Sequence, residues 1–232
     1  MVRRLLKFIK MVILILFLIS AMIAILFVYA FKVEPYRLRT ESLTLQTGFS
    51  ESFNVVQISD IQISESFTIE NLNRVVQKIN EQIPDVVLFT GDLYEVYADY
   101  HDDAALINTL SGIKAKYGKF AIWGNRDYGG GAESKYERIM EQSGFRLLRN
   151  EPDVADKYAD QGFDLIVSGH SHGGQVNVPF LPRMTTALAE KYVDGLYQLN
   201  DQTSLYVNSG IGTSRYPIRF GVIPQITVFS LE

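Results

Sequence analysis

The stretch Gly169-His170-Ser171-His172-Gly173-Gly174-Gln175 directly follows the apolar run Leu165-Ile166-Val167. The apolar run predicts a buried strand, which places two imidazoles, one residue apart, at its carboxyl end. The two glycines let the backbone approach a bound ion or phosphate closely. Because His101 is the only other histidine in 232 residues, a polar loop with scattered surface histidines is the weaker interpretation. The pattern indicates a metal site.

Three other apolar runs also end in an oxygen-bearing side chain. Residues 55–59 lead to Asp60, residues 86–91 lead to Asp92, and residues 120–124 lead to Asn125. Their length and composition predict buried strands of an α/β protein. A single aspartate after a strand is most often a turn or helix cap. Three such residues in order before a His-x-His turn are typical of a site for hard or borderline divalent ions.

Taken together, the four motifs resemble those of the calcineurin-like metallophosphoesterases, in particular their membrane-associated bacterial branch. They are Ser59-Asp60-Ile61-Gln62, Gly91-Asp92-Leu93, Gly124-Asn125-Arg126-Asp127 and the His-x-His turn. The resemblance covers the chain from about Phe53 to the C-terminus. It implies an α/β fold of two packed mixed β-sheets flanked by helices in four layers. It also implies two divalent ions that share a bridging carboxylate and a bridging hydroxide, which attacks phosphorus in line.

The resemblance also assigns the metal ligands motif by motif. Asp60 and His172 would hold the first ion, Asn125 and His170 the second, and Asp92 would bridge them. Asn125 and His170 are thereby also expected to be catalytic.

The first and third motifs depart from the family pattern. Gln62 replaces a histidine; its amide oxygen can still coordinate, and it favours Mn²⁺ or Mg²⁺ over Fe or Zn²⁺. Arg126 replaces the histidine that would protonate a leaving group or steady the phosphate. Arginine keeps its proton near neutral pH but binds phosphate oxygens well, so we expect Arg126 to be a catalytic phosphate clamp rather than a general acid. A solvated loop residue is the alternative.

The third departure is a missing histidine between the third and last motifs. The sequence passes from Leu148-Arg149-Asn150 directly to Glu151-Pro152-Asp153, with Asn150 where the family has a metal-binding histidine. This indicates the loss of a strand-and-helix segment and predicts a weaker second metal site. Two hypotheses follow. The chain is a metal-dependent phosphoesterase, a hydrolase of phosphoester or pyrophosphate bonds, or it is a degenerate relative that binds metal or phosphate with little or no turnover.

Residues 11–31 form an uninterrupted run of uncharged residues. As a helix the run would be about 31 Å long, close to the ~30 Å hydrocarbon core of a bilayer. A signal peptide has a shorter apolar region of about 7–15 residues, so we expect an uncleaved anchor. Basic residues before the run favour a cytoplasmic N-terminus and an extracytoplasmic domain. The expected division is a basic N-terminus at 1–10, an anchor at 11–31, a linker at 32–50 and the catalytic domain at 51–232.

Charge and composition limit the partners. From residue 41 onward the chain has 15 basic and 25 acidic residues, a net charge of −10, which disfavours nucleic acid. The absence of cysteine excludes disulfides and thiolate metal sites. The expected partners are the membrane and a phosphorylated small molecule or lipid-linked substrate. The resemblance suggests cell-envelope intermediates such as acylated sugar nucleotides.

Periodicity predicts further elements around these motifs. Thr68 is a candidate cap for a helix that ends before Pro84. Other helices are expected at 104–117, 134–142 and 153–160, and strands at 195–198, 204–207, 218–220 and 226–229.

Overall fold

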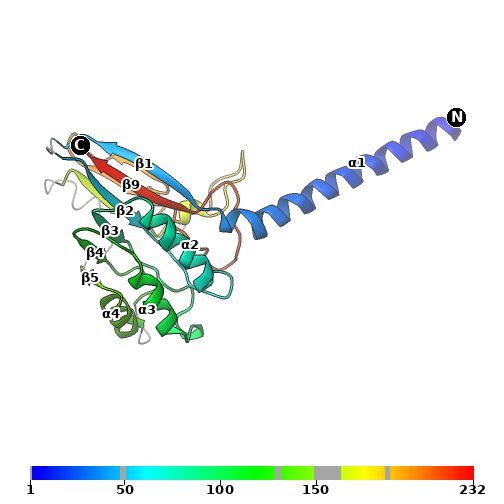
Figure 1. The fold of residues 1–232 in the computed structure, drawn as a ribbon. Coiled ribbons are helices and arrows are strands. Elements are labelled where there is room, and N and C mark those ends of the chain that lie inside the picture. Colours follow the sequence, from blue (N-terminus) through cyan, green and yellow to red (C-terminus); the bar gives the residue numbers. More distant parts are fainter. Residues whose placement is uncertain (1, 48–50, 129–131, 149–162, 186–188) are drawn as a thin grey trace.

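The computed structural model describes the chain except residues 1, 48–50, 129–131, 149–162 and 186–188. It contains two β-sheets flanked by helices (Figure 1), which confirms the expected α/β class. The six-stranded sheet has the order β1-β9-β2-β3-β4-β5, and the three-stranded sheet has the order β6-β8-β7. The strands are β1 (Arg39–Leu45), β2 (Phe53–Ile58), β3 (Val86–Phe89), β4 (Gly118–Ala121), β5 (Phe145–Leu147), β6 (Leu165–Ser168), β7 (Gly195–Gln198), β8 (Ser204–Val207) and β9 (Gln225–Leu231).

Strands β2, β3, β4 and β5 are parallel, whereas β9 is antiparallel to β2. The carboxyl ends of the parallel strands therefore meet at one edge of the sheet. Three helices lie together against one face of this sheet (Figure 1): α2 (Ile69–Asn80), α3 (Asp103–Ser111) and α4 (Ala132–Gln142). Their buried side chains join those of the strands in the main hydrophobic core.

Local sequence signals explain the bounds of α2 and α3. Thr68 and Asn71 form a capping box at the start of α2, as the sequence predicted. The predicted helix at 104–117 ends early, at Ser111. The reason is that the Asn80 side chain accepts the N–H of Lys114 at 2.8 Å and donates to the Gly112 carbonyl at 2.9 Å. These bonds replace the helical ones, and the chain turns toward β4.

Two stretches differ from the sequence-based expectation in the six-stranded sheet and its neighbourhood. The expected linker at 32–50 contains β1, which pairs along its whole length with β9, so the sheet begins before residue 51. Residues 218–220 do not form a strand; only Phe220 makes an isolated bridge, with Val176. Arg219, the middle residue of this stretch, has a fully buried side chain that donates to the carbonyls of Gly212 and Ser209 rather than forming part of a sheet face. The predicted helix at 153–160 and Asn150 lie outside the described residues.

Buried polar side chains join the two sheets. Gln57 on β2 donates to the Ser168 carbonyl at 2.9 Å, and Asn208 donates to the Thr227 hydroxyl on β9, also at 2.9 Å. The Tyr206 hydroxyl on β8 accepts a bond from Gln225 at 2.8 Å. These side chains are almost completely buried. Directional bonds in a dry interior fix the position of one sheet on the other.

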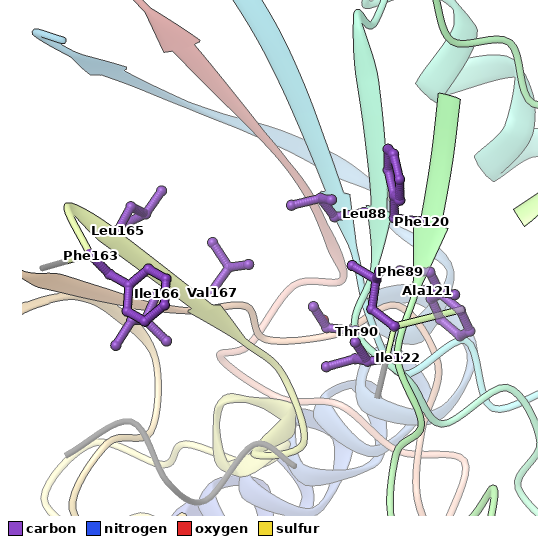
Figure 2. Close-up of a pocket in the computed structure, with 11 residues that line it drawn as sticks. Leu88, Phe89, Thr90, Phe120, Ala121, Ile122, Phe163, Leu165, Ile166 and Val167 are labelled. Carbon is purple, nitrogen blue, oxygen red and sulfur yellow. The ribbon is translucent and has the colours of Figure 1, made fainter. Parts of the chain in front are cut away.

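Next to this polar contact the sheets separate around an apolar cleft of about 500 Å³. Figure 2 shows side chains of β3 and β4 on one side of the cleft and side chains of β6 on the other. The β6 strand is at the edge of its sheet. The cleft is lined by Leu88, Phe89, Thr90, Phe120, Ala121, Ile122, Leu148, Phe163, Leu165, Ile166 and Val167.

The N-terminal helix α1 (Val2–Val28) extends away from the domain (Figure 1). It is long and apolar enough to cross a membrane by its length and composition. It continues into short helical turns at Tyr29–Val33 and Glu34–Tyr36. These turns are held by the domain, because the Ala30 carbonyl accepts the N–H of Arg219 at 3.0 Å. Glu34, only 2% exposed, accepts the N–H of Val222 at 2.8 Å.

We predict that Glu34→Ala lowers the free energy of unfolding by about 1–3 kcal/mol, because it leaves a buried N–H without its acceptor. Thermal unfolding of the full chain in detergent measures the change. Glu65→Ala, an exposed glutamate, is the control and should stay within about 0.5 kcal/mol of the unmodified protein. Equal effects of the two substitutions would contradict a structural role for the Glu34 carboxylate.

Candidate metal centre

The loops that follow β2, β3 and β6 meet at one place. The N–H of Asp60 donates to the Gly91 carbonyl at 2.9 Å, and the N–H of Gln62 donates to the Asp92 carbonyl at 3.1 Å. The N–H of His170 donates to Asp60 Oδ2 at 2.9 Å. The structure therefore brings the first, second and last motifs into direct contact.

Residues with left-handed backbone conformations are concentrated in these loops. Among the described residues nine non-glycine residues have positive φ, and six of them belong to the motifs. This conformation costs an ordinary residue on the order of 1–3 kcal/mol, and such strain is concentrated at functional sites. The six are Asp60, Gln62, Asp92, His170, His172 and Gln175.

Asp60 is buried and has one oxygen without a protein partner. Its Oδ2 accepts bonds from the Ser59 hydroxyl at 2.5 Å and from His170 N–H. Its Oδ1 has no hydrogen-bond partner and lies 3.5 Å from His172 Nε2. Burial, and then the charge of Asp92, raise the pKa of Asp60 to about 7. A cation bound here would stabilise the ionised form.

Gln62 and Asp92 form the neighbouring part of the site. Gln62 Nε2 donates to Asp92 Oδ2 at 3.3 Å, while Gln62 Oε1 is buried without a partner. Asp92 Oδ1 accepts the N–H of Arg126 at 2.8 Å, and burial raises the pKa of Asp92. Two buried, unpaired oxygens in one strained cluster fit a divalent cation, for which carboxylate and amide oxygens are suitable ligands.

Four of the six predicted ligands approach one another in two side-chain pairs, Asp60 with His172 and Gln62 with Asp92. In the part of the chain that the structure describes, no three or more aspartate, glutamate, histidine or cysteine side chains are arranged as a group that could hold a metal ion. Two of the six predicted ligands, Gln62 and Asn125, are amides. Asn125 is exposed, whereas His101 lies exposed ahead of α3 and in none of the motifs.

His172 is held from both sides of its ring. Its Nε2 faces Asp60, its Nδ1 lies 3.4 Å from Arg219 Nη2, and the Gly212 backbone also hydrogen-bonds the ring. Burial, followed by the charge of Arg219, lowers the pKa of His172 well below its usual value. The imidazole is therefore neutral at pH 7, which is the form that binds metal.

Arg219 is a residue of the site that the motifs did not reveal. Its fully buried guanidinium donates to the carbonyls of Gly212, at 2.6 and 3.0 Å, and Ser209, at 3.0 Å. Burial lowers its pKa to about 10, so the group stays charged at neutral pH. The Arg219 guanidinium therefore holds the loop at residues 209–212 next to His172. The sequence feature that could have indicated this role is an arginine between two apolar residues, in Ile218-Arg219-Phe220. An arginine that is buried with its neighbours needs hydrogen-bond partners inside the protein.

Asp127 connects the second and third motifs. Its Oδ2 accepts the N–H groups of Asp92 and Gly124, both at 2.8 Å, and its Oδ1 accepts that of Leu93 at 3.1 Å. Burial and the charge of Asp92 raise the pKa of Asp127 to about 8. The sequence placed Asp127 in the third motif but gave it no role. The structure shows that it positions the loops after β3 and β4.

The side chain of Arg126 bridges two loops beside the site. It donates to the Glu95 carbonyl at 2.6 Å and to the Ser214 hydroxyl at 2.5 Å, and it forms an ion pair with Glu95 at 3.4 Å. A guanidinium has five N–H donors, so these contacts leave capacity for a phosphate. The residue is anchored rather than solvated.

Glycines permit the close approach of these loops. A Cβ atom at Gly124 would overlap the Asp92 carboxylate, and one at Gly169 would overlap the Ser59 hydroxyl. Gly91 has a φ of +91°, and a Cβ there would overlap the backbone of Gly124. A side chain at any of these positions would displace a predicted metal ligand or its support.

Comparisons with known proteins agree with the motifs. The family model of the calcineurin-like phosphoesterases matches residues 53–156. The uncharacterized metallophosphoesterase YkuE of Bacillus subtilis is 33% identical over 256 positions, covering 88% of this chain and 89% of the relative. The phosphodiesterase YaeI of Escherichia coli is 23% identical, and the alignment covers 77% of this chain and 82% of the YaeI chain. The crystal structure of the nuclease MPE from Pseudomonas putida superposes with a TM-score of 0.44 and 15% sequence identity. The superposition covers 69% of this chain and 76% of the nuclease chain.

The alignment with the Bacillus subtilis protein also bears on chain length. It runs over 256 positions, but 88% of this chain is only about 204 residues. About 50 positions of this alignment therefore have no residue in this chain.

We predict that Gly124→Ala weakens Mn²⁺ binding by about 10- to 100-fold, because the added methyl group displaces the Asp92 carboxylate. Calorimetric titration of the purified chain measures the affinity, and circular dichroism checks the fold. Gly112→Ala is the control, because Gly112 follows α3 and lies in none of the motifs. Its new methyl group would lie 3.1 Å from the Thr109 carbonyl, which must shift by a few tenths of an ångström, and would touch no predicted ligand. Unchanged Mn²⁺ affinity in Gly124→Ala would contradict the assignment of Asp92.

Proposed function

Because the chain belongs to the calcineurin-like metallophosphoesterases, we propose that it is a membrane-anchored hydrolase of a phosphoester or pyrophosphate bond that uses two divalent ions. The observation that carries the proposal is the meeting of three strand-end loops whose ligand residues have strained, left-handed backbones. Two buried oxygens in these loops, on Asp60 and Gln62, have no protein partner. Protein stability alone gives no reason to maintain either feature.

The proposed metal assignment follows the resemblance of the motifs to those of the family. Asp60, Gln62 and His172 would hold one ion, and Asn125 and His170 the other, with Asp92 between them. We propose Mn²⁺ as the metal, since carboxylate and amide oxygens outnumber imidazoles in this set. Bound ions of this kind supply Lewis-acid activation of water and of phosphoryl oxygens.

The protein groups around the ligands orient them and bind the phosphate. Asp127 holds the N–H groups of the loops after β3 and β4 in place, and Arg219 keeps His172 neutral and fixed. The Arg126 guanidinium, held by Glu95 and Ser214, would direct its remaining N–H groups toward phosphate oxygens. A preoriented charge of this kind favours a transition state in which negative charge develops on those oxygens.

A lipid-linked phosphate or pyrophosphate, such as an acylated sugar nucleotide, is the substrate class that we favour. The apolar cleft of Figure 2 begins directly behind the site: Thr90 is two residues before Asp92, and Val167 is three residues before His170. An acyl chain matches its apolar lining. The apolar helix α1 supports the same class, and its flanking charges favour a cytoplasmic N-terminus and an extracytoplasmic domain.

A second candidate is a degenerate relative that binds one ion or a phosphate ligand and turns over little. The absence of a histidine between residues 128 and 169 favours it, as do the roughly 50 positions of the Bacillus subtilis relative that have no counterpart here. Metal stoichiometry separates the two candidates. About two equivalents of Mn²⁺ support the hydrolase, and one or none supports the degenerate relative.

We predict that Asp92→Asn removes most of the bound Mn²⁺, because it takes a negative charge from the carboxylate proposed to bridge the ions. Elemental analysis of the purified full chain measures metal per protein. His101→Ala should leave the stoichiometry unchanged, since His101 lies outside every motif. If Asp92→Asn retains the full metal content, the bridging assignment is wrong.

The leaving-group dependence tests the role of Arg126. Without a histidine to protonate the leaving oxygen, cleavage should fall steeply as the leaving group becomes a poorer acid, so pyrophosphates and aryl phosphates should react faster than alkyl phosphates. Arg126→His should raise cleavage of alkyl esters by about 100-fold or more, and Arg126→Lys, which keeps the charge, should not. Rates across esters of graded acidity measure this. A flat dependence in the unmodified chain would mean that another group supplies the proton.

A further inference from the structure

An exposed apolar loop projects from the domain between Val178 and Met184. The Phe180 side chain is fully exposed, and those of Leu181 and Met184 are 63% and 65% exposed. Pro179 and Pro182 interrupt the segment, so two of its residues have no N–H donor. Contiguous exposed apolar side chains on a domain are typical of a contact surface for a protein or a membrane.

The base of this loop is attached to the segment that holds the end of α1. The N–H of Asn177 donates to the Phe220 carbonyl at 2.7 Å. The Phe220 ring packs edge-on against Tyr29, with ring centroids 6.5 Å apart, and the adjacent Arg219 N–H binds the Ala30 carbonyl. Loop and helix therefore share one support, and in Figure 1 the loop, drawn in yellow, projects on the side of the domain from which α1 leaves.

The chemistry around the loop is that of a membrane interface. Tyr216 is exposed nearby, in the segment whose carbonyl oxygens accept bonds from Gln175. Arg215 is exposed beside it. Aromatic, aliphatic and basic side chains together are characteristic of surfaces that lie at the level of lipid headgroups.

We propose that the loop 178–184 inserts into the surface of the bilayer that α1 crosses, as a second membrane contact. A phospholipid layer is the expected occupant because the end of α1 defines where the membrane surface lies, and the loop starts from the same support. The proposal rests on the membrane anchoring in the proposed function and is independent of catalysis. Its effect is to orient the site relative to the lipid surface.

Tryptophan quenching by brominated lipids tests this contact in the full chain. Phe180→Trp is reconstituted into phosphatidylcholine vesicles that have bromine either near the headgroup or near the chain end. The native Trp123, the only tryptophan, gives the background. We expect the added emission to shift to the blue and to be lost mainly with headgroup-proximal bromine.

Two control variants make the outcomes distinguishable. In the Phe17→Trp variant the new tryptophan lies within α1, and its fluorescence should be quenched most by bromine near the ends of the acyl chains. Tyr117→Trp precedes β4 at the opposite end of the sheet, is 59% exposed in the unmodified chain, and should not be quenched. Quenching of Phe17→Trp without quenching of Phe180→Trp overturns the loop contact and leaves the anchor intact. Absence of quenching in both overturns the anchor, and the loop proposal with it. A blue shift of Phe180→Trp without quenching assigns the loop to a protein contact and also overturns the proposal.

Discussion

The close approach of the loops after β3 and β4 is the constraint on which the site depends. Only glycine fits at residues 91 and 124, since a Cβ at either position would overlap the other loop. Three backbone N–H groups are buried where the loops meet, and the Asp127 carboxylate accepts all three. At the same place Asp92 has a left-handed backbone conformation, and its carboxylate accepts a bond from Gln62. The backbone strain of Asp92 and the burial of the Asp92 and Asp127 carboxylates therefore occur together where the two loops touch.

The sequence predicted correctly those features that depend on a residue and its neighbours in sequence. Apolar runs that end in Asp60, Asp92 or His170 predicted the strands. The meeting of Asp60 and Asp92 follows because β2 and β3 are parallel neighbours, whereas His170 comes from the other sheet. Thr68 predicted the start of α2 for a similarly local reason. Features that depend on partners distant in sequence were missed. The β1 strand is defined by pairing with β9, the end of α3 is set by Asn80 of α2, and residues 218–220 follow the buried Arg219 rather than their strand-like pattern.

The two sheets contact each other in two chemically different ways. Around Gln57, Asn208 and Tyr206 they are joined by buried hydrogen bonds, which require a specific geometry. Beside β3, β4 and β6 the facing side chains are apolar and leave a cleft. The polar part therefore determines how the sheets are placed, and the apolar part lines the cleft between them. The residues of the polar contact do not line the cleft, so the sheets can keep this placement whatever fills the cleft.

The short connection between α1 and the site has a geometric consequence. Arg219 binds Ala30 through its backbone and contacts His172 through its side chain, so a single residue separates the end of the helix from a proposed metal ligand. These contacts fix the distance between the end of the helix and the site. With α1 in a bilayer, the enzyme would search for substrate in two dimensions, and its reach would select phosphate groups close to the lipid surface over those displayed on long polar extensions.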